Sequence, residues 1–179
     1  MMYDANQNKI QGWMSNIGLD WLYEQARKYK NIAEIGSWRG RSTHALASGT
    51  KGYVFAIDHW KGSASELHSA HKEATDPEKD IFIEFTENMK PFHNVVSIRI
   101  DHFLAPFIFA DGCFDMIFID GDHKYENVKY DVNAWLPKLA PNGLFCGHDY
   151  EQAFLPKIAG ELGLNIKKID IDSLWILEA

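Results

Sequence analysis

A chain of 179 residues is long enough to bury the hydrophobic core of one domain, and we expect a single domain over residues 1–179. Its formal net charge of −7 argues against a nucleic-acid backbone or an anionic membrane as the main partner, and favours a small-molecule substrate. No apolar run approaches the ~20 residues of a membrane span, and the polar N-terminus lacks the apolar core of a signal peptide. The sequence therefore predicts a cytoplasmic protein.

Short apolar stretches alternate along the chain with segments of helical periodicity. In chain order, we expect a helix over 19–26, a strand over 31–37, a helix over 41–48, a strand over 53–58, a helix around 81–89, a strand over 95–101, a strand over 114–120, a helix over 125–136, a strand over 144–149 and a helix over 154–162. This alternation is typical of a parallel sheet that helices cover on both faces.

The C-terminal tail predicts two further strands, over 165–171 and 174–177. Only Asp172 and Ser173 separate them, and such a short connection favours a hairpin over another crossover. The sequence therefore predicts an α/β fold with a doubly wound, mostly parallel sheet and a C-terminal antiparallel hairpin that puts one antiparallel strand near the edge.

The first strand runs into a turn with two glycines, Gly36 and Gly40, and the turn runs into a helix. Glycine lets the backbone take a positive φ and lets a ligand approach closely. The start of the helix offers unpaired N–H groups and a partial positive charge to an anionic group. Taken alone, this turn is equally compatible with a purely structural role.

Asp58 ends the next strand, 22 residues after Gly36, and adds a second part to the signal. In doubly wound folds an acidic residue at this point can accept hydrogen bonds from both hydroxyls of an adenosine ribose. The dinucleotide pattern G-x-G-x-x-G is absent, and Trp38 would obstruct a pyrophosphate. The turn therefore suits a nucleoside cofactor with a small carboxylate tail and no phosphates.

From Glu34 to Ser42 the pattern E-x-G-x-x-x-G-x-S resembles motif I of class I S-adenosylmethionine-dependent methyltransferases, in the version of catechol O-methyltransferase-like enzymes. Residues 120–150 are similar to small bacterial methyltransferases that include macrocin-type sugar O-methyltransferases, and the likeness covers about residues 31–150. The resemblance implies a Rossmann-like methyltransferase fold with S-adenosylmethionine as cofactor. It assigns to the cofactor site Glu34 and Trp38 within the motif, Gly36 and Gly40 along the methionine part, Ser42 at its carboxylate, Asp58 at the ribose, His59 or Trp60 at the adenine face, Asp101 and His102 at the adenine edge, and Asp120.

Five ionisable residues gather at the ends of two predicted strands: Asp120, Asp122 and His123 after the fourth, and His148 and Asp149 after the fifth. In open α/β sheets these strand ends border the ligand crevice. An ionisable group that is buried there loses solvation and is compensated only when it is paired or coordinated. Two polar surface loops are the alternative explanation.

By the same resemblance, Asp120 and Asp149 bind a divalent metal, and His123 is the general base at a position where catechol-type enzymes carry Lys. Mg²⁺ prefers carboxylate and water oxygens, which suits the two aspartates. The third ligand departs from both patterns, because Tyr150 stands where catechol-type enzymes have Asn and His148 where macrocin-type enzymes have an acid. His148 would suit a softer ion such as Mn²⁺ or Fe²⁺, and metal dependence stays open.

These features together predict an O-methyltransferase that acts on a sugar or a phenol. A divalent ion would lower the pKa of the acceptor hydroxyl, His123 would take its proton, and the oxygen would attack the methyl group. A nucleotide-dependent oxidoreductase, a metal-dependent hydrolase that uses the Asp/His cluster, and a non-catalytic module that keeps the cofactor pocket stay open as alternatives.

Selection of the acceptor is expected from the polar tract 61–80, from the N-terminal segment, or from a neighbouring subunit of a homo-oligomer. In the tract, His68 and His71 are expected to be solvated. For Trp13 and Trp21, packing in the core or in an interface is favoured over a lid.

Overall fold

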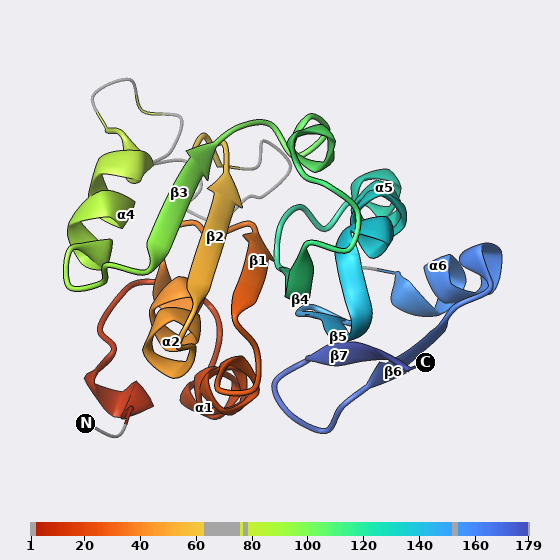
Figure 1. Ribbon diagram of the computed structural model, residues 1–179, viewed down its shortest axis with the longest axis horizontal. Helices are drawn as coiled ribbons and strands as arrows, with labels where there is room; N and C mark the ends of the chain where they lie inside the picture. Colours follow the sequence, from red (N-terminus) through yellow and green to blue (C-terminus); the bar gives the residue numbers. More distant parts are fainter. Residues whose placement is uncertain (1–2, 63–75, 77–78, 152–153, 179) are drawn as a thin grey trace.

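The computed structural model describes residues 3–62, 76, 79–151 and 154–178. Seven strands form one sheet in the order β3-β2-β1-β4-β5-β7-β6 (Figure 1). The strands are β1 (Asn31–Ile35), β2 (Tyr53–Asp58), β3 (Val95–Arg99), β4 (Phe114–Ile119), β5 (Leu139–Gly147), β6 (Asn165–Lys168) and β7 (Trp175–Glu178). Strands β1 to β5 pair in parallel, and β7 runs antiparallel between β5 and β6. The predicted fold class is therefore confirmed.

Helices cover both faces of the sheet. They are α1 (Asn16–Ala26), α2 (Arg41–Gly49), α4 (Ile81–Met89), α5 (Tyr125–Trp135) and α6 (Leu155–Leu162), with short 3₁₀ turns at Ala5–Gln7, Ala105–Ile108 and Leu136–Lys138. Figure 1 shows α4 beside β3 at one end of the sheet and the β7–β6 pair at the other. Each helix agrees with a predicted one to within a few residues, because its apolar side chains recur at helical spacing.

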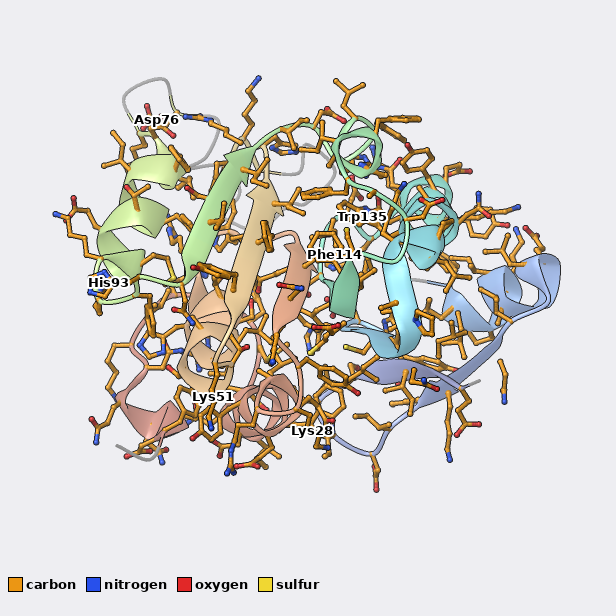
Figure 2. All side chains as sticks on the ribbon, viewed as in Figure 1. Lys28, Lys51, Asp76, His93, Phe114 and Trp135 are labelled. Carbon is orange, nitrogen blue, oxygen red and sulfur yellow. The ribbon has the colours of Figure 1, made fainter. Side chains whose placement is uncertain are left out.

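Successive side chains of the central strands point to opposite faces of the sheet, so the hydrophobic core forms a cluster on each face. In β1, Ile32 packs in the cluster that contains α1 and α2, whereas Ala33 and Ile35 pack in the cluster that contains α5 and α6. Phe114 of β4 and Trp135 of α5 lie side by side in the second cluster, with ring centroids 6.2 Å apart (Figure 2). The sheet is therefore buried on both sides, which makes its strand ends the natural place for a ligand site.

Strand β5 begins earlier and ends earlier than the predicted range 144–149. It starts at Leu139, and its pairing with β4 has a register shift before Leu144. The prediction missed this first part because Pro141 and Gly143 are residues typical of turns. At the other end, His148 and Asp149 lie beyond the strand in the loop that follows it.

The C-terminal hairpin has shorter strands than predicted, but its turn is centred on the two predicted residues, Asp172 and Ser173. The two strands are separated by residues 169–174, and Asp172 and Ser173 both have left-handed backbone conformations, with φ of 48° and 57°. The amide of Leu174 donates to the carbonyl of Ile171 at 2.9 Å, which closes the turn.

Two further expectations concern parts of the chain beyond the sheet. His68, His71 and most of the tract 61–80 lie outside the described residues. Among the described residues, no helix has both the length and the apolar character needed to cross a membrane.

Candidate active site

The ends of the parallel strands and the N-terminal segment enclose one cavity of about 230 Å³. Most of the residues assigned to the cofactor, to the metal or to catalysis line it: Gly36, Trp38, Ser42, Asp58, His59, His102, Asp120, His123, His148 and Asp149. Four assigned residues are not part of this lining: Glu34, Gly40, Trp60 and Asp101. The sheet therefore brings the two groups of candidate residues into one site, while the binding roles themselves stay predictions.

The turn after β1 passes directly against the end of β4. Gly36 has a φ of 92°, and a Cβ atom at this position would lie 2.2 Å from the carbonyl oxygen of Asp120. The amide of Asp120 in turn donates to the carbonyl of Ile35 at 2.8 Å. Position 36 therefore requires glycine for two reasons, the left-handed backbone and the close approach of the neighbouring strand end.

Glu34 lies beneath this turn, fully buried, and accepts a hydrogen bond from the hydroxyl of Thr43 in α2. Burial raises the pKa of Glu34 to about 7, although nearby hydroxyls of Ser42, Thr43 and Ser37 oppose that shift. Gly40, with a φ of 90°, is the N-cap of α2. The two residues therefore support the start of α2 and do not line the cavity.

Asp58 ends β2, and its carboxylate accepts hydrogen bonds from backbone amides of the turn after β1 and of the loop after β2. Its Oδ2 accepts from the amide of Trp38 at 2.9 Å, and its Oδ1 accepts from the amide of Trp60 at 2.6 Å. His59 lines the cavity, and its Nδ1 accepts from the amide of Lys61 at 2.9 Å. The carboxylate thus stands at the cavity wall in a fixed orientation.

The structure places Trp60 away from the cavity. Its φ is 53°, its ring packs on Phe82 and Phe85 of α4, and its indole N–H donates to the carbonyl of Trp38 at 2.6 Å. Because the side chain is only 2% exposed and points into the core, it does not offer its face to a ligand. Of the two residues assigned to the adenine face, His59 alone lines the cavity.

In the cavity wall near β3, His102 pairs with a residue that the sequence analysis did not single out, Asp131. His102 Nδ1 lies 2.8 Å from Oδ1 of Asp131, a residue of α5 that is completely buried, and both residues line the cavity. Burial raises the pKa of Asp131, and its Oδ2 has no hydrogen-bond partner among the described residues. The sequence offered one indication of a role for Asp131, because this residue falls within the buried apolar stripe of Val128, Val132 and Trp135 on α5. Asp101 instead is exposed and accepts from the amide of Phe103 at 2.9 Å.

The N-terminal segment, one of the regions from which acceptor selection was expected, forms another wall of the cavity. Gln11, Gly12, Trp13 and Met14 line the cavity, and Trp13 is 49% exposed. The guanidinium of Arg41 holds this segment by donating to the carbonyls of Met14, Asn8 and Ile10 at 2.9 to 3.0 Å. Trp13 therefore lies at the cavity mouth and not in the core, which corrects the expectation of core packing for this residue, whereas Trp21 packs against the core.

The Asp/His cluster occupies the opposite side of the cavity, at the ends of β4 and β5. His123 Nε2 lies 2.9 Å from Asp149 Oδ2, and His148 Nδ1 lies 3.0 Å from the same oxygen and 3.5 Å from Asp120 Oδ1. Asp149 has a φ of 57°, an uncommon left-handed conformation for a residue other than glycine. Two histidines and two aspartates thus converge at one point of the cavity wall.

Burial and pairing pull the pKa values of this cluster in different directions. Burial alone would lower the pKa of His148, but hydrogen bonds with Asp120 and Asp149 outweigh it and raise that pKa to about 11. Burial raises the pKa of Asp120, which His148 only partly offsets. For Asp149, the contacts with His123 and His148 outweigh burial and lower its pKa. The protonation state of each residue in the cluster therefore depends on its neighbours, as is frequent at functional sites.

Three of these side chains fit a divalent ion. Asp120, His148 and Asp149 each offer one ligand atom, and these atoms lie within 4.8 Å of one another. Two carboxylate oxygens and one imidazole nitrogen form a donor set that suits Mn²⁺ or Fe²⁺ as well as Mg²⁺. Tyr150, by contrast, packs against the core and does not belong to this group.

Comparison with known proteins agrees with this fold. SAH-bound methyltransferase PaMTH1 from Podospora anserina has a TM-score of 0.68 at 18% identity, with 93% of this chain and 79% of that chain covered. A Staphylococcus aureus protein assigned as a caffeoyl-CoA O-methyltransferase has a TM-score of 0.66 at 17% identity, with 98% of this chain and 88% of that chain covered. At these identities the likeness concerns the fold.

Sequence comparison gives the family. The uncharacterized protein y4gI of Sinorhizobium fredii (strain NBRC 101917 / NGR234) is 28% identical over 142 residues, which cover 73% of this chain but only 14% of that protein. The chain therefore spans about one seventh of the length of this relative. A family profile described as a methyltransferase domain matches residues 33–150, from the middle of β1 to the residue after Asp149. Since that match covers well over half of the sequence, the chain belongs to the methyltransferase-domain family.

Proposed function

We propose that this protein is an S-adenosylmethionine-dependent O-methyltransferase that acts on a hydroxyl group of a small molecule, a sugar or a phenol. One observation carries the proposal: a single cavity joins the glycine turn and Asp58 on one side to His123 and Asp149 on the other. Membership of the methyltransferase-domain family supports methyl transfer, and the Staphylococcus aureus neighbour supports an oxygen acceptor.

The cofactor half of the cavity would lie between β1 and β3. S-adenosylmethionine supplies the methyl group on a positively charged sulfur. Gly36 lines the cavity where the methionine part would lie, and Ser42 in the first turn of α2 lies where an anionic carboxylate is favoured. Each oxygen of Asp58 accepts one backbone amide and keeps capacity for a ribose hydroxyl.

The reaction would be an in-line transfer of the methyl group. His123 takes the proton of the acceptor hydroxyl, and Asp149, 2.9 Å from Nε2, stabilises the imidazolium that forms. The acceptor oxygen bonds to the methyl carbon as the carbon–sulfur bond breaks, and S-adenosylhomocysteine leaves. His123 then returns the proton to solvent.

Asp120, His148 and Asp149 would hold a divalent ion in this proposal. When bound, the ion supplies positive charge beside the acceptor and lowers the pKa of its hydroxyl. The two aspartates would supply the negative charge that holds the ion, and the buried imidazole of His148 would supply the third ligand atom.

Calorimetry with S-adenosylhomocysteine and with NAD⁺, each with and without Mn²⁺, tests the cofactor. We expect binding of S-adenosylhomocysteine and none of NAD⁺, since a pyrophosphate would meet Trp38. Transfer of a labelled methyl group to a panel of phenols and sugars then tests the acceptor class. Binding of NAD⁺ alone would replace the proposal with an oxidoreductase, and metal-dependent hydrolysis of esters without cofactor would replace it with a hydrolase.

A further inference from the structure

The turn of the C-terminal hairpin inserts one carboxylate between the start of α1 and the Asp/His cluster. Oδ2 of Asp172 accepts a hydrogen bond from the amide of Ser15 at 2.6 Å, and the same oxygen lies 3.8 Å from Nε2 of His148. These three residues come from the N-terminal segment, the loop after β5 and the β6–β7 turn. A contact among segments so far apart along the chain requires the complete fold.

The surroundings of Asp172 hold its carboxylate in this position. A Cβ atom at Gly18 would lie 2.4 Å from Oδ2 of Asp172, so α1 leaves space for the carboxylate at its first turn. Asp172 and the following Ser173 both adopt left-handed conformations. Two successive residues in this conformation, closed by the hydrogen bond from Leu174 to Ile171, form the type I′ turn that is typical of hairpins. This turn and the space at Gly18 together fix where the carboxylate lies.

The two ring nitrogens of His148 face different groups. Its Nδ1 faces Asp120 and Asp149, the other two candidate ligands of the ion. Its Nε2 is buried and has no hydrogen-bond partner among the described residues. A histidine that binds a metal through one nitrogen almost always donates the N–H of the other to a carboxylate, a carbonyl or water. The carboxylate that faces Nε2 is that of Asp172.

We propose that Asp172 is the positioning residue of the metal site. When Nδ1 of His148 ligates a divalent ion, Nε2–H donates to Asp172, which requires the 3.8 Å separation to close by about 1 Å. This contact fixes the tautomer and the ring orientation of His148. Because Asp172 also holds Ser15, occupancy of the ion is linked to the N-terminal segment, whose Trp13 and Met14 line the cavity. The inference rests on the metal site of the proposed function.

The test is the affinity for Mn²⁺, measured by electron paramagnetic resonance without any substrate or cofactor. We expect Asp172→Asn to bind Mn²⁺ about 10–100-fold more weakly, the usual cost of removing such a partner, while its affinity for S-adenosylhomocysteine stays within about twofold. Asp170→Asn, an exposed neighbour in the same hairpin, should match the wild type. Gly18→Ala should weaken Mn²⁺ binding with the carboxylate still present, because it displaces Asp172.

A second readout tests the link to the N-terminal segment. Saturating Mn²⁺ should slow hydrogen exchange of the Ser15 amide in the wild type and leave it unchanged in Asp172→Asn. Equal Mn²⁺ affinity of the wild type and a folded Asp172→Asn would overturn the inference. A wild type that transfers methyl groups without binding Mn²⁺ would also overturn it, yet leave methyl transfer standing. A wild type that binds Mn²⁺ but not S-adenosylhomocysteine would overturn the proposed methyl transfer, and the Asp172 comparison would still decide the inference.

Discussion

His102 and Asp131 are joined in the cavity wall, with Nδ1 of the imidazole 2.8 Å from Oδ1 of the buried carboxylate. Burial alone would lower the pKa of His102, but the hydrogen bond and the charge of Asp131 outweigh it, so the pKa lies above 6.5. We expect Asp131→Asn to lower the pKa of His102. Titration of the His102 ring by NMR measures it, and Asp101→Asn, at a more distant carboxylate, should have a smaller effect. An unchanged pKa in Asp131→Asn would contradict the pairing.

Replacing His123 by Ala should remove the general base and leave the affinities for the divalent ion and for S-adenosylhomocysteine unchanged. Methyl transfer should fall on the order of 10²–10⁴-fold, the usual contribution of a general base. Raising the pH should partly restore the rate, because more of the acceptor is then ionised. Initial rates between pH 6 and pH 10 check this, with calorimetry of S-adenosylhomocysteine to show an intact cofactor site. A variant as fast as the wild type would exclude His123 as the base.

The ion and the cofactor should be separable by substitution. Asp120→Asn and Asp149→Asn should lose divalent-ion binding, since each removes one of the three ligand atoms. Both should keep S-adenosylhomocysteine, which we propose contacts mainly the residues after β1 and β2. Calorimetry with each ligand measures the two affinities, and Asp122→Asn is the matched control on the same loop. Methyl transfer that is insensitive to EDTA would remove the ion from the reaction.

Asp58→Ala should weaken binding of S-adenosylhomocysteine by about 1.5–3 kcal/mol, because it removes a charged acceptor of hydroxyl hydrogen bonds. The same carboxylate accepts from the amides of Trp38 and Trp60, so the variant also loosens the turn. Asp58→Asn keeps one acceptor oxygen and should lose less affinity. Unchanged affinity in Asp58→Ala would show that the ribose is held elsewhere.

Glu34 should make the stability of the protein depend on pH. Its pKa is about 7 in the folded protein against an ordinary 4.5, so the folded state keeps a proton that the unfolded chain has lost. The contribution of Glu34 is therefore fully present below pH 4.5 and is lost as the pH rises through 7, by about 3 kcal/mol. Glu34→Gln should abolish this part of the dependence. Urea unfolding from pH 4 to pH 8 compares the two proteins, with the exposed Glu24→Gln as control.

Periodicity was sufficient to predict most of the fold. Strand β2 and helix α4 have the predicted bounds, because each is a clean apolar pattern between polar residues. The first part of β5 escaped prediction because Pro141 and Gly143 read as a turn. The alternation of strands with helices also indicated which residues would meet at the carboxyl ends of the parallel strands, and that part of the site could be predicted.

The rest of the site depends on backbone detail and on contacts that no local pattern carries. Trp60 matched a ligand position by its place after Asp58, but its positive φ turns the ring toward α4. Asp131 was not predicted as a site residue, although it lies on the buried side of α5. Trp13 belongs to an irregular segment that Arg41 places over the cavity, and such placement has no periodicity.

The order of strands in the sheet has a consequence for how the protein folds. β1 lies between β2 and β4, although β4 begins only at Phe114, and the cavity draws on residues from Gln11 to Asp149. Contacts between such distant parts of a chain form late and slow folding. A ligand of this cavity consequently finds no partial site on an unfolded chain. At 100 times its dissociation constant it would add about 2.7 kcal/mol to the stability of the native state. In cells, the supply of that ligand would then help to determine how long each folded molecule survives.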